Sequence, residues 1–233
     1  MIPEGAADRP LADRLAAELA AVREGPADEH QVAARRVGQA VRTVIDLMTA
    51  TTASNEVLID AAEKISEVAD LLTGQGSNRR YEGLAEASGL GHDSAFFDWS
   101  PQLGLSNPLA PPIFVDIQDG IVVGKVSFGS AYEGPPGCVH GGSIAAAFDE
   151  ILGLTQSLSG QVGMTGTLTV RYRQPTPLHT DLSFEGRLDG VSGRKVLASA
   201  KLYAGEDLTA EATGLFVTIT PERFRALSAN RER

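Results

Sequence analysis

The stretch that decides the fold is Tyr132–Gly153, which reads YEGPPGCVHGGSIAAAFDEILG. It predicts a glycine- and proline-rich loop that runs into a helix through His140, Gly141 and Gly142. Glycine there lets the backbone approach a ligand closely, because no Cβ stands in the way. The first N–H groups of a helix have no intrahelical partner and lie at the positive end of the helix dipole. This turn is therefore predicted to bind an anion, or the oxyanion that develops during acyl transfer.

Two acidic residues, Asp149 and Glu150, lie two turns into the helix predicted over 143–157. The apolar residues of that helix fall on one side: Ile144, Phe148, Ile151 and Leu152. Spacing alone favours a solvent-facing charge pair, although a carboxylate beside an apolar face is costly unless it has a partner or a task. Asp149 follows Gly142 by seven residues, about 10 Å along the helix axis. One chain would hardly place both groups on one carbonyl, so if both act, they come from two chains of a dimer.

Strand patterns flank this helix on both sides. Before it, ranges 113–117 and 121–128 enclose Asp119 and Gly120, a hairpin turn. After it come four further strand-like ranges, 168–173, 182–191, 196–203 and 210–219. Two strands, one helix and then four strands predict an α+β fold in which an antiparallel sheet packs on one helix.

The N-terminal part of the chain has a helical pattern instead. One apolar stripe consists of Val37, Val41, Val44 and Met48, and a second of Leu58, Ala62, Ile65, Ala69 and Leu72. Asp28 followed by Gln31 resembles a capping box at the start of the first helix, and 11–22 predicts a weaker third helix. We expect a helical extension over 1–95 for docking or oligomer contacts, a main domain over 96–221 and a tail over 222–233. Within the linker-like stretch 74–112, the aromatic residues Phe96, Phe97 and Trp99 are expected to pack against the main domain.

Composition excludes several classes of function. The chain has 233 residues and a net charge of −10, which argues against a nucleic-acid partner because phosphate binding needs a basic face. No apolar run approaches the roughly 18–20 residues of a membrane span, and the N-terminus lacks a signal-peptide pattern, so we expect a cytoplasmic protein. The single cysteine, Cys138, is predicted to be structural, and the histidines show no metal-ligand spacing, so no metal is implied.

The motifs, taken in order, resemble those of the hotdog-fold acyl-CoA thioesterases. They are EGPPGCVHGGSIAAAFDE at 133–150, Met164-Thr165, YRQPTPL at 172–178 and Gly193-Arg194-Lys195. The match spans roughly 112–221 and is most similar to the phenylacetic-acid-pathway type, in the branch with a glycine/proline-rich motif. Gly134 stands where some members carry a polar residue, which puts in doubt any preference for aryl-acyl substrates.

The resemblance implies a curved antiparallel sheet around one long helix, and a homodimer or a dimer of dimers with sites at the subunit interface. It implies that the thioester carbonyl points at the N–H of Gly141 or Gly142, and that His140 shapes this turn. Asp149 of the neighbouring chain would act as general base or nucleophile, with no cofactor beyond the CoA thioester substrate. Thr165 matches the hydroxyl residue beside the acid, and Thr167 is a fallback on the same predicted strand face.

Four basic residues are candidates for the CoA phosphates, because charge-assisted hydrogen bonds suit phosphate: Arg171, Arg173, Arg194 and Lys195. The expected reaction is hydrolysis of a fatty or medium-chain acyl-CoA in lipid metabolism, although the chain length is not readable from the sequence. The alternative is a non-catalytic acyl-CoA or acyl-carrier binding protein, or an assembly subunit, because one fold hosts many functions. A hydratase on this fold is less favoured, because the matching residues belong to the thioesterase pattern.

Overall fold

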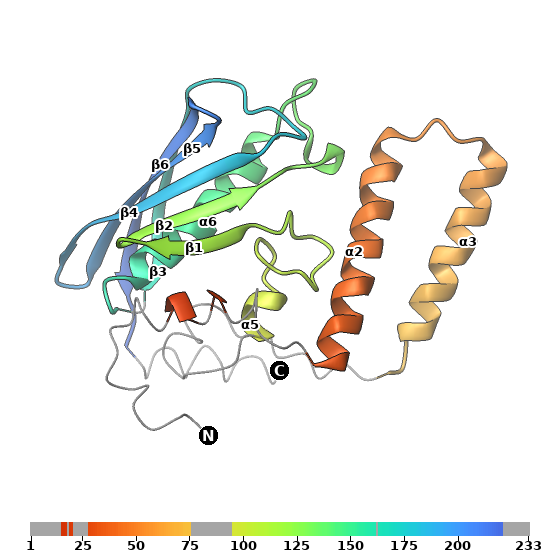
Figure 1. Ribbon diagram of the computed structural model, residues 1–233, viewed down its shortest axis with the longest axis horizontal. Coiled ribbons are helices and arrows are strands. Elements are labelled where there is room, and N and C mark those ends of the chain that lie inside the picture. The colour runs from red at the N-terminus through yellow and green to blue at the C-terminus, as the bar shows by residue number, and fades with distance from the viewer. Residues whose placement is uncertain (1–14, 18, 21–27, 76–94, 162, 221–233) are drawn as a thin grey trace.

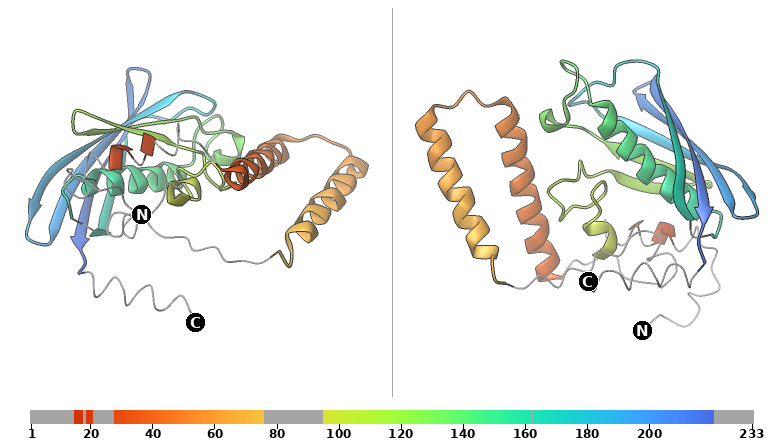
Figure 2. Two further views of the ribbon diagram at one scale, coloured as in Figure 1. Left: turned by 60° about the horizontal axis from the view of Figure 1, so that its bottom comes forward. Right: turned by 180° about the vertical axis from the view of Figure 1, so that it is seen from behind.

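The computed structural model describes residues 15–17, 19–20, 28–75, 95–161 and 163–220. The strands are β1 (Phe114–Gln118), β2 (Ile121–Val126), β3 (Gly163–Tyr172), β4 (Leu182–Ser192), β5 (Lys195–Ala204) and β6 (Asp207–Thr218). The helices are α2 (Glu29–Ala50), α3 (Asn55–Leu72), α5 (Ala95–Asp98), the short 3₁₀ turn η2 (Ser130–Tyr132) and α6 (Gly141–Ser157). The strands form one antiparallel sheet, in the order β1-β2-β4-β5-β6-β3, that wraps around α6 (Figures 1 and 2). The predicted α+β hotdog architecture, with N-terminal helices, is thus confirmed.

The helix α6 is held tightly against the inner face of the sheet. Phe148 packs edge-on against Phe184 of β4, with ring centroids 5.1 Å apart. Glycines on the strands make room for the helix: a Cβ on Gly124 would lie 2.7 Å from Ile151 Cδ1, and one on Gly186 would clash with Thr155. This packing fixes the rotation of α6 about its axis and so decides which of its side chains stay exposed.

The edge strand β3 contains a β-bulge at Gly166, where the pairing with β6 shifts between Thr165 and Thr167. Beyond the bulge, Leu168 and Val170 pack against the core, so Thr167 lies on the outer face by alternation. Thr165 instead reaches inward to α6. The prediction that Thr167 shares a face with Thr165 is therefore wrong, because one extra residue reverses the alternation.

The predicted elements agree with those observed, with small shifts at most ends; the exception is β3, which begins five residues before the strand predicted over 168–173. Asp28 caps α2 by accepting the Gln31 N–H at 2.7 Å, as expected, and α6 begins at Gly141, two residues earlier than predicted. Phe97 is buried as expected, whereas the side chain of Phe96 is not described. The helix predicted over 11–22 lies outside the described residues except for helical pieces at 15–17 and 19–20, and so does the predicted tail over 222–233.

Helix α2 is fastened to the segment 98–112 that precedes β1. Arg35 forms an ion pair with the buried Asp98 at 2.7 Å. One turn on, Gly38 lies directly against this segment, since a Cβ there would be 2.8 Å from the Leu105 carbonyl oxygen. Arg42 donates to the same carbonyl at 2.9 Å. At this helix the N-terminal extension is therefore an integral part of the fold.

Candidate active site

The loop before α6 folds back on itself and fixes the position of His140. The His140 N–H donates to the Tyr132 carbonyl at 2.8 Å, and the Gly134 N–H donates to the Cys138 carbonyl at 2.9 Å. A Cβ on Gly134 would lie 2.8 Å from His140 Cα. The loop therefore needs glycine at 134, which gives a packing reason for the absence of a polar side chain there.

His140 caps α6 and uses one of the two candidate amides. Its Nδ1 accepts the Gly142 N–H at 3.0 Å, which requires a neutral ring with the proton on Nε2. The Gly141 N–H, by contrast, makes no hydrogen bond within the described part of the chain. At this positive end of the helix dipole, the unpartnered donor is thus Gly141.

Tyr172, at the end of β3, holds Gly141 from the other side. Its hydroxyl donates to the Gly141 carbonyl at 2.7 Å. A Cβ on Gly141 would lie 3.3 Å from the Tyr172 hydroxyl oxygen, so the two residues are in close contact. The sequence pattern gave no signal for this pair, because it joins residues 31 positions apart.

Asp149 and Thr165, which the family resemblance places beside each other, are brought together by α6 and β3. The Thr165 hydroxyl donates to Asp149 Oδ1 at 2.8 Å, and both residues are exposed. The bulge at Gly166 lies directly after Thr165 and adjusts this part of the edge strand. An exposed carboxylate with one oxygen held by a hydroxyl is oriented for proton transfer or for nucleophilic attack.

Glu150 differs from its neighbour Asp149 in environment. Its Oε1 accepts a hydrogen bond from the Ser100 hydroxyl at 3.4 Å, and Ser100 itself is fully buried. Burial raises the pKa of Glu150 to about 7, while the Ser100 hydrogen bond lowers it and the charge of Asp149 raises it further. Glu150 is therefore half-buried against Ser100 of segment 98–112, whereas Asp149 is exposed.

The carboxylate and the unpartnered amide lie far apart within one chain. Asp149 follows Gly141 by eight residues along α6, about 12 Å of helix. Their partners Thr165 and Tyr172 lie toward opposite ends of β3. The two groups are therefore too distant to act on one carbonyl carbon of the same site.

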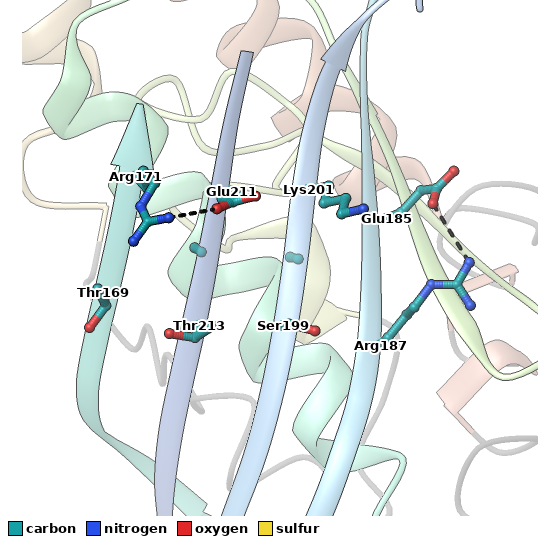
Figure 3. Close-up of a pocket in the computed structure, with 10 residues that line it drawn as sticks. Thr169, Arg171, Glu185, Arg187, Ser199, Lys201, Glu211 and Thr213 are labelled. Atoms are coloured by element: carbon teal, nitrogen blue, oxygen red, sulfur yellow. Dashed lines mark ion pairs between the residues drawn. The ribbon is translucent and has the colours of Figure 1, made fainter. Parts of the chain in front are cut away.

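The four candidate phosphate ligands fall in two places. Arg171 and Arg173 project from the outer face of the sheet, away from α6, and both pair with Glu211, at 3.7 and 2.6 Å. Figure 3 shows Arg171 in a shallow cavity of about 500 Å³ on this face. Arg194 and Lys195 lie instead at the β4–β5 turn, where the Arg194 guanidinium donates to the Thr218 carbonyl.

Comparison with known proteins agrees with this fold. The profile of the thioesterase superfamily matches residues 136–211. Acyl-coenzyme A thioesterase THEM4 of Bos taurus is 35% identical over 97 residues, 41% of this chain and 40% of that protein. The Xenopus laevis THEM4 is 40% identical over 96 residues, 40% of this chain and 43% of that protein. This chain thus matches about two fifths of the length of these curated relatives.

A solved structure extends the likeness. A crystal structure of a thioesterase superfamily protein is 34% identical, with a TM-score of 0.70, over 79% of this chain and 94% of the other. The chain therefore belongs to the thioesterase superfamily. Across the described residues, no group of His, Cys, Asp and Glu side chains suits a metal ion. No helix in the same part of the chain is long and apolar enough to cross a membrane.

Proposed function

We propose that this protein hydrolyses an acyl-CoA thioester, with a fatty or medium-chain acyl group, to the free acid and CoA. The observation that carries the proposal is the hydrogen bond between Thr165 of β3 and Asp149 of α6. The same helix α6 begins at Gly141, whose N–H is unpartnered within the described part of the chain. A carboxylate and an oxyanion donor are the two groups that hydrolysis of a thioester needs. The curated relatives named acyl-coenzyme A thioesterases support this choice of substrate.

Two chains complete the site in this proposal. β3 is a ten-residue edge strand with no neighbour on its outer side among the described residues, and such an edge is a template for strand pairing. Antiparallel pairing of two copies of β3 about a two-fold axis places the Tyr172 end of one strand beside the Thr165 end of the other. Gly141 of one chain then approaches Asp149 of its partner.

The chemistry follows from these positions. Asp149 takes a proton from water while the water oxygen attacks the thioester carbon, and the Gly141 N–H stabilises the charge on the carbonyl oxygen. The C–S bond then breaks, and the CoA sulfur leaves with the proton that Asp149 holds. In the alternative route, the Asp149 carboxylate attacks the carbon itself, the C–S bond breaks and CoA leaves as the thiolate. Water then hydrolyses the anhydride to the free acid and the Asp149 carboxylate, and the proton released in this step goes to the CoA thiolate.

The basic residues at the β4–β5 turn suit the CoA phosphates in this dimer. Lys195 pairs with Val217, which in turn pairs with Met164 at the start of β3. In the paired dimer, this end of β3 lies beside the partner's Gly141 turn. Arg194 and Lys195 are therefore the stronger candidates for binding the CoA phosphates. Arg171 and Arg173 lie on the outer face and would reach these phosphates only around the edge of the sheet.

The first experiment measures thiol release from acyl-CoAs of several chain lengths. Asp149→Asn keeps the Thr165 hydrogen bond but removes the base, so kcat should fall by about 10²–10⁴-fold. Asp189→Asn is the matched control, because that aspartate bonds Ser199 on another strand pair and should not affect turnover. Equal rates for wild type and Asp149→Asn, or no release from any acyl-CoA by the wild type, would contradict the proposal.

A mixing experiment tests the shared site. Gly141→Pro deletes the amide with little backbone strain, because proline suits the first position of a helix and His140 already has an extended backbone. The proline Cβ would lie 3.3 Å from the Tyr172 hydroxyl oxygen, so the Tyr172 side chain must shift slightly. Mixing Gly141→Pro chains with Asp149→Asn chains gives mixed dimers with one intact site each. Random exchange should restore about a quarter of wild-type activity, since half of the dimers are mixed and each has one of two sites. No recovery in confirmed mixed dimers would show that the two groups act within one chain.

A further inference from the structure

The helices α2 and α3 expose an unusual amount of apolar surface. The exposed side chains that form one stripe on each helix are Val37, Val44, Leu47 and Met48 on α2, and Val57, Ile65, Val68, Leu71 and Leu72 on α3. Their exposed fractions range from 38% to 71%, and α3 has no buried residue. Single exposed apolar side chains are ordinary, whereas contiguous apolar patches mark interaction sites.

Each stripe follows one face of its helix, and on α3 the exposed Lys64 lies within that face. At 3.6 residues per turn, the α3 stripe covers an arc of about 120°. The acidic residues of α3 form a separate band that adjoins one edge of the stripe: Glu56, Asp60, Glu63, Glu67 and Asp70. On α2, the side that contacts segment 98–112 carries Arg35, Gly38 and Arg42. The apolar stripe of α2 therefore points away from the domain.

The hairpin does not bury these stripes by itself. α2 and α3 run side by side, joined by a short connection, without packing closely (Figures 1 and 2). Even if they closed on each other, a two-helix seam covers a narrower arc than these stripes occupy, so each helix needs more than one neighbour. A membrane surface is a poor partner, because the acidic side of α3 would be repelled by anionic lipids.

We propose that the α2–α3 hairpin docks on the same hairpin of a second copy of this chain, so that their apolar stripes form the core of a four-helix bundle. Burying the nine side chains on both copies removes on the order of 1,500 Å² of apolar surface. Stable protein interfaces bury about 1,200–2,000 Å² in total. A symmetric hairpin pair therefore supplies enough surface for a stable association.

This contact is separate from the β3 edge. α2 lies near the β1 side of the domain, and β3 forms the other edge of the sheet (Figure 1). One chain can therefore use both surfaces at once, and together they produce a dimer of dimers. The hairpin contact does not rest on the proposed function, because none of its residues belongs to the candidate active site.

The test is the mass of the full chain in solution, by analytical ultracentrifugation over a range of concentrations. Val44→Glu and Ile65→Glu place a charge within the two stripes and should halve the mass of the wild-type assembly. Val32→Glu and Ile59→Glu are matched controls, since both side chains are exposed apolar residues outside the stripes, and should leave the mass unchanged. Thiol release should persist in all four variants, because the β3 pairing and the active site remain.

Three outcomes would overturn the hairpin contact. The first is a wild-type mass retained by the two stripe variants, and the second is an equal loss of mass in the two controls. The third is a wild-type mass that never exceeds that of a single dimer at any concentration, together with the same mass for the two stripe variants. Circular dichroism with unchanged helix content in all four variants ensures that a lower mass reports lost association and not unfolding. Loss of activity with an unchanged mass would count against the proposed function and leave the hairpin contact standing.

Discussion

Glu150 makes the stability of this protein depend on pH in a defined direction. Burial raises its pKa from an ordinary value of 4.5 to about 7. Between these two values the folded protein binds the Glu150 proton and the unfolded chain does not. The unfolded state therefore binds fewer protons, and the free energy of unfolding falls as pH rises through this window.

The magnitude follows from the size of the shift. One pKa unit corresponds to 1.36 kcal/mol, so the raised pKa of Glu150 should lower the free energy of unfolding by about 3 kcal/mol between about pH 4.5 and 8. Glu150→Gln keeps an oxygen for the Ser100 hydroxyl but cannot ionise. The variant should match the wild type near pH 4.5 and exceed its stability by up to about 3 kcal/mol at pH 8.

The assay is urea unfolding of both proteins at several pH values and one protein concentration. Glu185→Gln serves as control, because that glutamate is exposed on the outer face beside Arg187 and should not change the pH profile in this way. A Glu150→Gln variant whose stability parallels that of the wild type at every pH, or falls below it at pH 8, would refute the reasoning.

Two further changes test contacts that position the site and the extension. Tyr172→Phe removes the hydrogen bond to the Gly141 carbonyl, and kcat should fall up to about tenfold with little change in KM, because in the proposed mechanism the Gly141 N–H acts on the transition state. Steady-state kinetics with a saturating acyl-CoA separates the two constants. Gly38→Ala places a methyl group against the Leu105 carbonyl, which should destabilise the fold by about 1–3 kcal/mol in spite of the better helix propensity of alanine. Thermal unfolding measures this loss of stability. Thr43→Ala, which also introduces alanine on α2 but at an exposed position, is the control.

The elements with strong periodicity were predictable from sequence, because local pattern determines them. The stripe of Ile144, Phe148, Ile151 and Leu152 gave α6 its sheet-facing side, and all four side chains are buried. The capping of α2 by Asp28 was equally local. The proximity of Asp149 and Thr165 was predictable only from the family resemblance, because local sequence patterns do not relate residues 16 positions apart.

The features that could not be predicted from the sequence depend on contacts between segments that are distant along the chain. The spacing predicts a surface charge at Glu150, but its carboxylate is half-buried and accepts a hydrogen bond from Ser100, fifty residues earlier. The sequence does not distinguish the amides of Gly141 and Gly142, whereas in the structure the Gly142 N–H donates to His140 Nδ1 and the Gly141 N–H does not. The docking of α2 depends on Asp98 and on carbonyl groups of segment 98–112, which carry no pattern of their own.

The bulge at Gly166 divides β3 into two parts whose side chains are out of phase. Residues before it present Thr165 to the helix, and residues after it present Leu168 and Val170 to the core. Removing this one residue would restore a regular zigzag, and either the threonine or the following half of the strand would then face the wrong side. Natural relatives of this chain should therefore tolerate length changes in the loops around β3 far more readily than a single deletion within it.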